Sequence, residues 1–328
     1  MNWLHASTAA LNASAKAHRN WGVKTNRWID AFDVAAKRGI FLAFRPLYKL
    51  GAAIVHESDS AGIIVNSNHP LSRQRYSVAH ELGHLFFKHY TTLDSNDIFE
   101  SGSPPKTDEE KLAESFASWF LMPPGLIDGY AARHGIDRIV TREQVYQLAL
   151  FLGTSYESTA QHLRNSKRAT PHRANDWLKR PPQDIKERLA VGFAPASWRS
   201  DIHMLDEIDD QMPRLVRSGD HVIVRLPEIP SSGYRWRHHD DARFAIVSDS
   251  YDSDYDAGER PVPTGKLRMR RFVLCVGDVE QRVDTALTFV QARSWKPAQS
   301  VRRFFAPMTI ESTARLGFPV RYLEELAA

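Results

Sequence analysis

Residues 80–84 have the sequence His-Glu-Leu-Gly-His, and this pattern determines our interpretation of the N-terminal half of the chain. The surrounding apolar spacing predicts a helix from Arg73 to about His89, with Ser72 as its N-cap. Histidines four positions apart project from one helix face, so both imidazoles can reach a single ion. The alternative is an amphipathic helix with two surface histidines. The apolar residues around the pair favour burial instead, and buried imidazoles need a partner.

The chemistry expected of this helix face is that of a metal ion with an activated water. Neutral imidazole suits Zn²⁺, and a catalytic zinc site keeps one position open for water, whose pKa zinc lowers to about 7. Glu81 lies beside the face formed by His80 and His84, so its carboxylate can accept a proton from that water and deliver it to a leaving amine. The pattern therefore predicts His80 and His84 as zinc ligands and Glu81 as the catalytic base.

The third ligand must come from another part of the chain. His89 is the nearest histidine, but the pattern with a third histidine after the motif needs glycine at 87 and histidine at 90, where this chain has Phe87 and Tyr90. We expect a second helix over residues 107–121, because its start has a capping-box pattern, Thr-x-x-Glu, and prolines follow it.

Three glutamates lie in the first half of that second helix. Glu110 and Glu114 are four positions apart and share a face, while Glu109 points elsewhere. Carboxylates near a helix start are also favoured by the helix dipole without any metal. On these grounds alone, Glu110 and Glu114 remain equally good candidates for the third ligand.

The composition is that of an ordinary globular protein, with 42% hydrophobic and 25% charged residues among 328. This length exceeds one typical core and suits two domains. The 43 basic and 39 acidic residues give a net charge of +4, an excess too small to indicate a nucleic-acid or acidic partner. The single cysteine, Cys275, excludes an intramolecular disulfide and fits a reducing compartment.

The pattern divides the chain into three parts and predicts an α+β fold. Residues 1–165 read as a mainly helical domain with a small sheet, because short apolar runs at 40–44, 52–56 and 62–66 are typical of strands. Residues 166–200 are basic, poor in large apolar residues and interrupted by prolines, so we interpret them as a linker. Residues 201–328 show period-two alternation punctuated by glycine and proline, which predicts an all-β sandwich or barrel.

Two segments resemble the core of ImmA/IrrE-type metallopeptidases: residues 73–84, RQRYSVAHELGH, and residues 110–123, EKLAESFASWFLMP. The resemblance covers roughly residues 20–165 and implies a zincin-like domain, gluzincin-like in having HExxH and a distal glutamate. The glutamate that opens the second segment is this family's third zinc ligand, which corresponds to Glu110. The family also implies limited proteolysis of a protein substrate, often a helix-turn-helix transcriptional repressor in stress, phage or mobile-element control.

A second resemblance covers roughly residues 200–312. Residues 226–236, LPEIPSSGYRW, read as a strand, a turn and a new strand, for which a purely structural turn is the alternative. They resemble a loop of chagasin-type cysteine-protease inhibitors, and residues 292–297, ARSWKP, are similar to that family's Arg-Pro-Trp loop. The resemblance implies an immunoglobulin-like sandwich with protein-binding loops. The implied binding residues are Ile229, Pro230, Ser231, Ser232, Gly233, Tyr234, Arg293 and Trp295.

The match to the inhibitor family is incomplete. Ile229 stands where the first loop has asparagine, and Ser294 stands where the Arg-Pro-Trp loop has proline. The middle glycine-rich loop is represented only by residues 258–265, without the usual pattern. The resemblance therefore supports the fold more strongly than it supports inhibition.

Three functional hypotheses follow. The first is a zinc endopeptidase whose β domain recognises protein or regulates the peptidase. The second is a cysteine-protease inhibitor or protein-binding module that carries a peptidase-like domain, with a papain-like protease as partner. The third is a DNA-bound regulator using residues 142–164 and the basic linker, and the low net charge makes direct DNA binding the least favoured. We expect no membrane partner and a cytoplasmic location, because there is neither a long apolar run nor a signal-peptide pattern.

Overall fold

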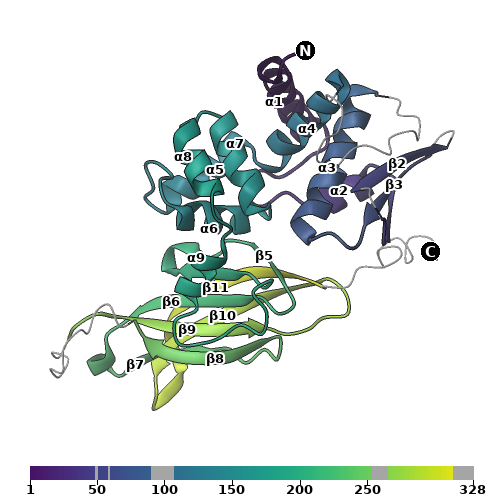
Figure 1. The fold of residues 1–328 in the computed structure, drawn as a ribbon. Helices are drawn as coiled ribbons and strands as arrows, with labels where there is room; N and C mark the ends of the chain where they lie inside the picture. The colour runs from purple at the N-terminus through teal and green to yellow at the C-terminus, as the bar shows by residue number, and fades with distance from the viewer. Residues whose placement is uncertain (49–50, 58–59, 90–106, 253–264, 313–328) are drawn as a thin grey trace. The chain divides into compact units, whose positions relative to one another are not determined.

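A computed structural model describes residues 1–48, 51–57, 60–89, 107–252 and 265–312 of the chain (Figure 1). These residues form two compact units, one ending at Arg180 and the other beginning at Pro181. The polar loop expected before residue 107 and the glycine-containing segment 258–264 lie outside the described residues.

The first unit is mainly helical and contains one small sheet. Its elements are α1 (Trp3–Asn20), α2 (Ala31–Lys37), β1 (Ile40–Arg45), β2 (Ala52–Glu57), β3 (Ser60–Asn66), α3 (Leu71–Phe87), α4 (Asp108–Leu121), α5 (Pro124–Arg133), α6 (Arg142–Leu152), α7 (Tyr156–Asn165) and α8 (Pro171–Leu178). The strand order is β1-β3-β2, in which β3 pairs in parallel with β1 and antiparallel with β2.

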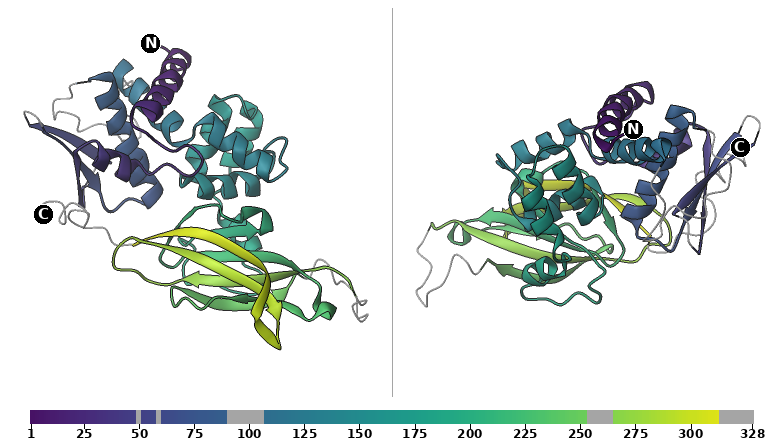
Figure 2. Two further views of the ribbon diagram at one scale, coloured as in Figure 1. Left: turned by 180° about the vertical axis from the view of Figure 1, so that it is seen from behind. Right: turned by 45° about the horizontal axis from the view of Figure 1, so that its top comes forward.

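Helix α3 is the central element of this unit. It contacts β2 and β3 on one side and α2 and α4 on others, as Figures 1 and 2 show. Val78, Ala79 and Leu82 of α3 are at most 1% exposed, so the helix is held by burial of its apolar face. On the side of α6, the buried guanidinium of Arg75 donates hydrogen bonds to the carbonyl oxygens of Leu152, at 3.2 Å, and Gly153. These contacts fix α3 on several sides.

Helix α4 is braced by α1, an element that the sequence pattern did not predict. Small residues of α1 are buried against its neighbours and allow a close helix approach; they are Ala6, Ala10, Ala13 and Ala17. Near the C-terminal end of α4, Nε1 of Trp119 donates to Ser7 Oγ at 3.0 Å, and Nε2 of His18 lies 2.9 Å from the carbonyl oxygen of Phe120. Helix α4 therefore packs against both α1 and α3.

The stretch expected to be a linker, residues 166–200, instead contains α8 and α9 (Gln183–Leu189). Trp177 of α8 is 2% exposed and donates from Nε1 to the carbonyl oxygen of Val140 at 3.3 Å. Ile185 of α9 is fully buried. Each helix is short and buries few large side chains among charged ones, so its apolar pattern is weak. The division between the units falls between these two helices.

The second unit is an antiparallel-rich sandwich of two sheets. Besides α9 its elements are β4 (Ile202–Asp206), η1 (Glu207–Asp209), β5 (Arg214–Arg217), β6 (His221–Glu228), η2 (Pro230–Ser232), β7 (Tyr234–His238), β8 (Phe244–Tyr251), β9 (Arg268–Val276), β10 (Val283–Arg293) and β11 (Lys296–Glu311). The sheet orders are β5-β11-β10-β7 and β4-β6-β9-β8. The α+β fold class is thus confirmed, with a helical unit followed by a β sandwich.

The sandwich core follows the period-two alternation of the strands. Val222, Val224 and Leu226 of β6 point inward toward residues of the facing sheet such as Phe289 and Phe304. The intervening Ile223 points to the opposite face, where it packs with Ile202, Val273 and Ala190 beside α9. Strand β6 is consequently buried on both faces around Ile223.

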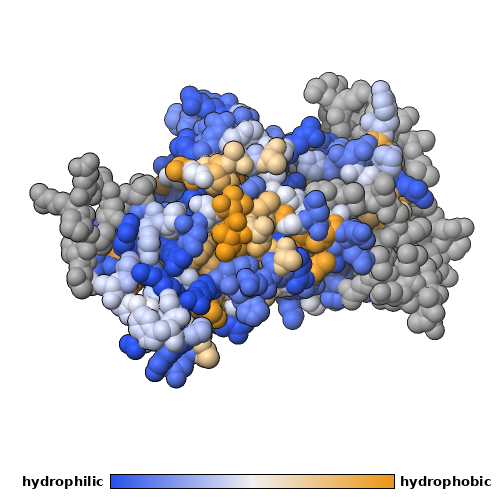
Figure 3. All heavy atoms as spheres, turned by 90° about the horizontal axis from the view of Figure 1, so that it is seen from below, coloured by the Kyte–Doolittle hydropathy of each residue, from blue (hydrophilic) through white to orange (hydrophobic). Residues whose placement is uncertain are grey.

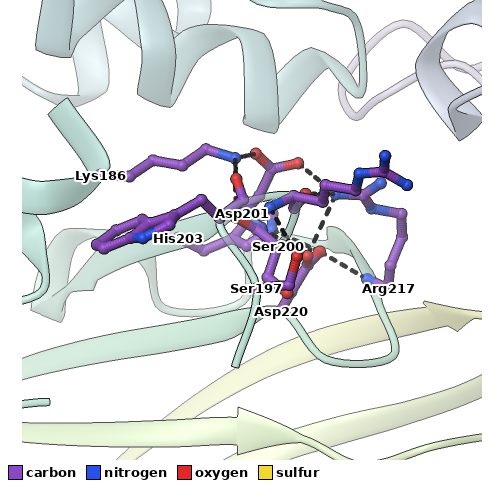
Figure 4. Close-up of polar contacts among 9 residues, drawn as sticks. Lys186, Ser197, Ser200, Asp201, His203, Arg217 and Asp220 are labelled. Atoms are coloured by element: carbon purple, nitrogen blue, oxygen red, sulfur yellow. Dashed lines mark hydrogen bonds and ion pairs between the residues drawn. The ribbon is translucent and has the colours of Figure 1, made fainter. Parts of the chain in front are cut away.

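A buried polar network ties α9 to the sandwich (Figure 4). Asp220 is 2% exposed and accepts hydrogen bonds from the backbone N–H groups of Asp201, at 2.7 Å, and Arg217, at 2.8 Å. Nε2 of His203 lies 3.4 Å from Oδ2 of Asp220. From α9, Lys186 reaches Oδ1 of Asp201 at 2.8 Å. The carboxylates are thus paired, as buried charges require.

Figure 3 shows one face of the molecule, on which hydrophilic residues surround smaller apolar patches. Among the helices in the described ranges, none has the length and apolar character required to cross a bilayer.

Candidate metal centre

The HELGH residues lie in the second half of α3. The helix begins at Leu71 with Pro70 in the N-cap position, so the expected cap at Ser72 is wrong. His80, Glu81 and His84 are 8%, 7% and 2% exposed. This burial excludes the alternative of two surface histidines. Buried imidazoles without polar partners would carry a desolvation cost, so the pair requires partners.

Glu110 of α4 completes a group of three with the two imidazoles. Its carboxylate oxygens lie 3.4 Å from Nε2 of His80 and 3.3 Å from Nε2 of His84, and the two Nε2 atoms are 3.0 Å apart. Thr107 is the N-cap of α4, and its hydroxyl accepts from the backbone N–H of Glu110 at 3.2 Å. The Glu110 side chain turns toward α3 and not back to the cap.

This donor set fits a tetrahedral zinc ion. Zinc binds imidazole nitrogen at about 2.0–2.1 Å and carboxylate oxygen at about 2.0–2.2 Å, so two ligand atoms on one tetrahedral ion lie about 3.3–3.5 Å apart. Here the two Nε2 atoms are 3.0 Å apart, Oε2 of Glu110 lies 3.4 Å from Nε2 of His80, and Oε1 of Glu110 lies 3.3 Å from Nε2 of His84. With one ligand atom from each residue, all three lie within 4.8 Å of one another. Within the described ranges, His80, His84 and Glu110 form the one group of potential metal ligands that converges in this way. Three protein ligands leave the fourth position open, as in catalytic sites.

The charges of the site are strongly coupled. Burial works to raise the pKa of Glu110, but hydrogen bonds to His80 and His84 outweigh it and hold this pKa far below its usual range. Burial also works to lower the pKa of His80, and its hydrogen bond to Glu110 together with nearby carboxylates raises it instead. The carboxylate of Glu110 is therefore ionised, as a metal ligand must be.

Glu81 differs from Glu110 in its surroundings. Burial raises the pKa of Glu81, and the charge of Glu110 raises it further, whereas His80 and His84 partly oppose this. A raised pKa makes a carboxylate a stronger base, so it accepts a proton more readily than an ordinary carboxylate. The environment of Glu81 thus suits proton transfer.

Gly83 permits the close approach of α3 and α4. A Cβ atom at this position would lie 3.1 Å from the Cα of Ala113 and 3.1–3.2 Å from side-chain atoms of Phe116, both in α4. These separations are shorter than ordinary van der Waals contacts, so only glycine fits without displacement. Because Glu110 lies one turn before Ala113, this contact sets how near its carboxylate comes to the imidazoles.

The other glutamates of α4 occupy different positions. Glu114 lies one turn beyond Glu110, and its backbone carbonyl accepts a hydrogen bond from Oη of Tyr76 at 3.0 Å. Burial raises the pKa of Tyr76, with the charge of Glu114 adding to the effect, so the phenol remains a donor. Glu109 is exposed. The choice between Glu110 and Glu114, open on the sequence pattern alone, falls geometrically to Glu110.

His89 lies beside His84, a contact that sequence reasoning missed. Lys88 ends α3 in the left-handed conformation, with φ of 58°, and the backbone N–H of His89 donates to the carbonyl oxygen of His84 at 2.9 Å. This turn brings Nδ1 of His89 to 3.2 Å from Nδ1 of His84. The contact is on the side of the His84 ring opposite the ligand nitrogen.

In the second unit, the structure gathers the predicted loop residues at one end of the sandwich. Tyr234 and Arg293 are paired across β7 and β10, and the Arg293 guanidinium lies 4.9 Å from the centre of the Tyr234 ring and 5.8 Å from that of Trp295. The Trp295 ring covers Gly233 so closely that a Cβ there would overlap it, and Gly233 has φ of 76°. Trp295 remains 64% exposed and Ile229 37% exposed.

The residues of the intervening turn are also ordered. Pro230, Ser231 and Ser232 form η2, and Ser232 Oγ donates to the carbonyl oxygen of Ile229 at 2.6 Å. Ser231 Oγ accepts from the backbone N–H of Gly265 at 2.9 Å. The turn is therefore held by a hydrogen bond within it and by one from Gly265.

A buried carboxylate that the sequence pattern did not single out supports this loop. Glu228, at the end of β6, is 1% exposed and accepts from the backbone N–H of Trp236 at 2.9 Å. Arg235 lies 2.8 Å and Arg270 3.3 Å from its oxygens. Glu228 thus closes the base of the 229–233 turn by joining β6, β7 and β9.

Comparison with known proteins agrees with the class that the first unit defines, a metallopeptidase-like domain. Residues 35–164 match the Peptidase_M78 family, described as the IrrE N-terminal-like domain. Within the first unit, these residues are therefore similar to the IrrE N-terminal-like domain. No curated protein is significantly similar to the chain.

Among the solved structures that are similar to the chain, the following three each cover 34% of it. The cysteine protease inhibitor EhICP2 from Entamoeba histolytica is 19% identical over 97% of its own length, with a TM-score of 0.28. The solution structure of amebosin is 18% identical over 98% of its length, also with a TM-score of 0.28. PbICP-C in complex with falcipain-2 is 10% identical over 92% of its length, with a TM-score of 0.23.

Proposed function

We propose that the protein is a zinc-dependent endopeptidase that cleaves a protein substrate at a limited number of bonds. The observation that carries the proposal is the convergence of His80, His84 and Glu110 on one point, with Glu81 buried beside them. The match of residues 35–164 to an IrrE-like peptidase family supports the same chemistry.

In this proposal, His80, His84 and Glu110 hold the metal. A bound zinc ion would supply Lewis acidity and lower the pKa of a water molecule toward neutrality. Glu81 accepts a proton from the attacking water and delivers it to the amine nitrogen that leaves when the peptide bond breaks. The raised pKa of Glu81 suits the acceptance of this proton.

The substrate class is a protein, and a helix-turn-helix transcriptional repressor is the candidate that the family likeness favours. We assign the β unit to protein recognition or regulation of the peptidase. The exposed Trp295 and Ile229, beside an ordered turn, offer the apolar anchors that protein interfaces use.

The test is to incubate a host-cell extract with the zinc-loaded protein and identify new protein N-termini by amine labelling and mass spectrometry. Glu81→Gln keeps the shape of the side chain but removes proton transfer, and Glu109→Gln is a matched exposed control. We expect new termini with wild type and Glu109→Gln, and none with Glu81→Gln at equal zinc content. The same termini with Glu81→Gln would contradict the proposal.

A second candidate function is inhibition of a papain-like cysteine protease by the β unit. The packing of Trp295 on Gly233 and the nearby Arg293 favour it, because they form a preorganised, exposed surface. Full-length protein should then inhibit papain, Trp295→Ala should weaken inhibition, and Trp198→Ala, which changes another exposed tryptophan of the same unit, should not. Absence of inhibition at the highest soluble concentration removes this function without affecting the peptidase.

A further inference from the structure

The contact between His84 and His89 has a consequence for the metal site. The two Nδ1 atoms are 3.2 Å apart, and the ring centroids are 5.3 Å apart with planes inclined at 67°. A hydrogen bond between two ring nitrogens requires that one carries a proton and the other offers its lone pair. The arrangement therefore couples the tautomer of one ring to that of the other.

The ligand role of His84 decides which ring donates. Nε2 of His84 faces His80 and Glu110, so its lone pair is the one available to a metal, and the proton of the neutral ring is then on Nδ1. The Nδ1–H group of His84 donates, and Nδ1 of His89 accepts. Ligating histidines commonly use their second nitrogen in this way, which fixes both tautomer and ring orientation.

His89 is itself held in place to accept this bond. The left-handed turn at Lys88 returns the chain toward His84, and the His89 ring stacks on Phe87 with centroids 5.5 Å apart and planes inclined at 16°. Its Nδ1 faces the side of His84 away from the ligand nitrogen. His89 is therefore placed to orient a ligand and not to serve as the third ligand.

We propose that His89 is a positioning residue that holds the His84 imidazole with its Nε2 lone pair directed at the metal. The inference rests on the proposed metal site and adds to it a residue outside the HExxH motif and the distal glutamate. Removing such a supporting hydrogen bond typically weakens metal binding about 10- to 100-fold.

The experiment measures zinc affinity of the full-length protein by competition with a chelating dye, which does not depend on a substrate. His89→Phe keeps an aromatic ring for stacking on Phe87 but removes the acceptor. His89→Asn restores an acceptor oxygen near the position of Nδ1. His172→Phe makes the same chemical change at an exposed site of α8 and is the control. Thermal unfolding of each metal-free variant separates loss of the hydrogen bond from loss of fold.

We expect His89→Phe to bind zinc at least about 10-fold more weakly than wild type, with His89→Asn recovering most of the loss and His172→Phe unchanged. Equal affinity of His89→Phe and wild type would overturn the inference. So would an Asn variant as weak as the Phe variant, since the acceptor would then be irrelevant. A wild type that binds no zinc would instead remove the proposed metal site, and with it this role for His89.

Discussion

Replacing Gly83 by alanine tests how closely α3 and α4 must approach for the metal site to form. The added methyl carbon would lie 3.1 Å from the Cα of Ala113, where ordinary contacts begin at 3.4 Å. Since that atom is backbone, α4 must move away by about 0.3 Å at this point, an overpacking that typically costs about 1–3 kcal/mol. Alanine is more favourable than glycine in a helix by about 1 kcal/mol, which offsets part of this loss of stability.

The displacement matters more for the metal than for the fold. Metal–ligand distances are held to within about 0.2 Å, and Glu110 moves with α4. We expect zinc affinity to fall about 10-fold, equivalent to about 1.4 kcal/mol, and the free energy of unfolding of the metal-free protein to fall by about 1 kcal/mol.

The assay is chelator competition for zinc together with denaturant unfolding of the metal-free protein. Gly129→Ala in α5 is the matched control, because a Cβ there has open space around it. That variant should bind zinc normally and gain up to about 1 kcal/mol of stability. Normal zinc affinity in Gly83→Ala would refute the reasoning that this glycine sets the position of Glu110.

Further predictions concern stability. Tyr76→Phe removes the hydrogen bond to the Glu114 carbonyl and should lower the free energy of unfolding of the first unit by about 1 kcal/mol in a urea titration. Asp220→Ala leaves buried donors unpaired and should cost the second unit about 3 kcal/mol, whereas the exposed Glu280→Ala should cost almost nothing. Burial works to raise the pKa of Asp220, but His203 and Arg217 hold it below its ordinary value. The stabilisation from Asp220 is therefore fully present above about pH 4 and is lost as the pH falls through the lower folded-state pKa. Denaturant unfolding of wild type at a series of acidic pH values measures this loss. A free energy of unfolding that does not change with acidic pH would contradict the prediction.

The sequence pattern was sufficient for some parts of the metal site and insufficient for others. Helical period places His80 and His84 on one face, and Glu110 and Glu114 on one face of the next helix. Choosing between the glutamates requires the rotation of α4 relative to α3, which depends on tertiary contacts such as that at Gly83. Local spacing carries no information on such contacts, so a family likeness was needed to favour Glu110.

The contact of His89 was beyond sequence reasoning for a different reason. It depends on a left-handed turn at Lys88, and lysine gives no signal for that conformation, which glycine or asparagine usually supplies. A third histidine at this spacing could have suggested a supporting role, but only the turn shows on which side of His84 it lies.

Regular elements with a strong period were predicted well, and short or irregular ones were not. The β6, β9, β10 and β11 runs were predicted as strands and are strands in the structure. Strand β8 was missed because exposed Ile246 and Val247 and a register irregularity break its alternation. Helices α8 and α9 were missed because Trp177 and Ile185 stand nearly alone among polar residues.

The most direct test of the metal centre is zinc content after dialysis, measured by mass spectrometry for wild type, Glu110→Ala and Glu109→Ala. The two glutamates are neighbours in the first turn of α4, but only Glu110 faces the imidazoles. We predict about one zinc per chain for wild type and Glu109→Ala, and almost none for Glu110→Ala. Full zinc content in Glu110→Ala, or none in wild type, would contradict the assignment of this site.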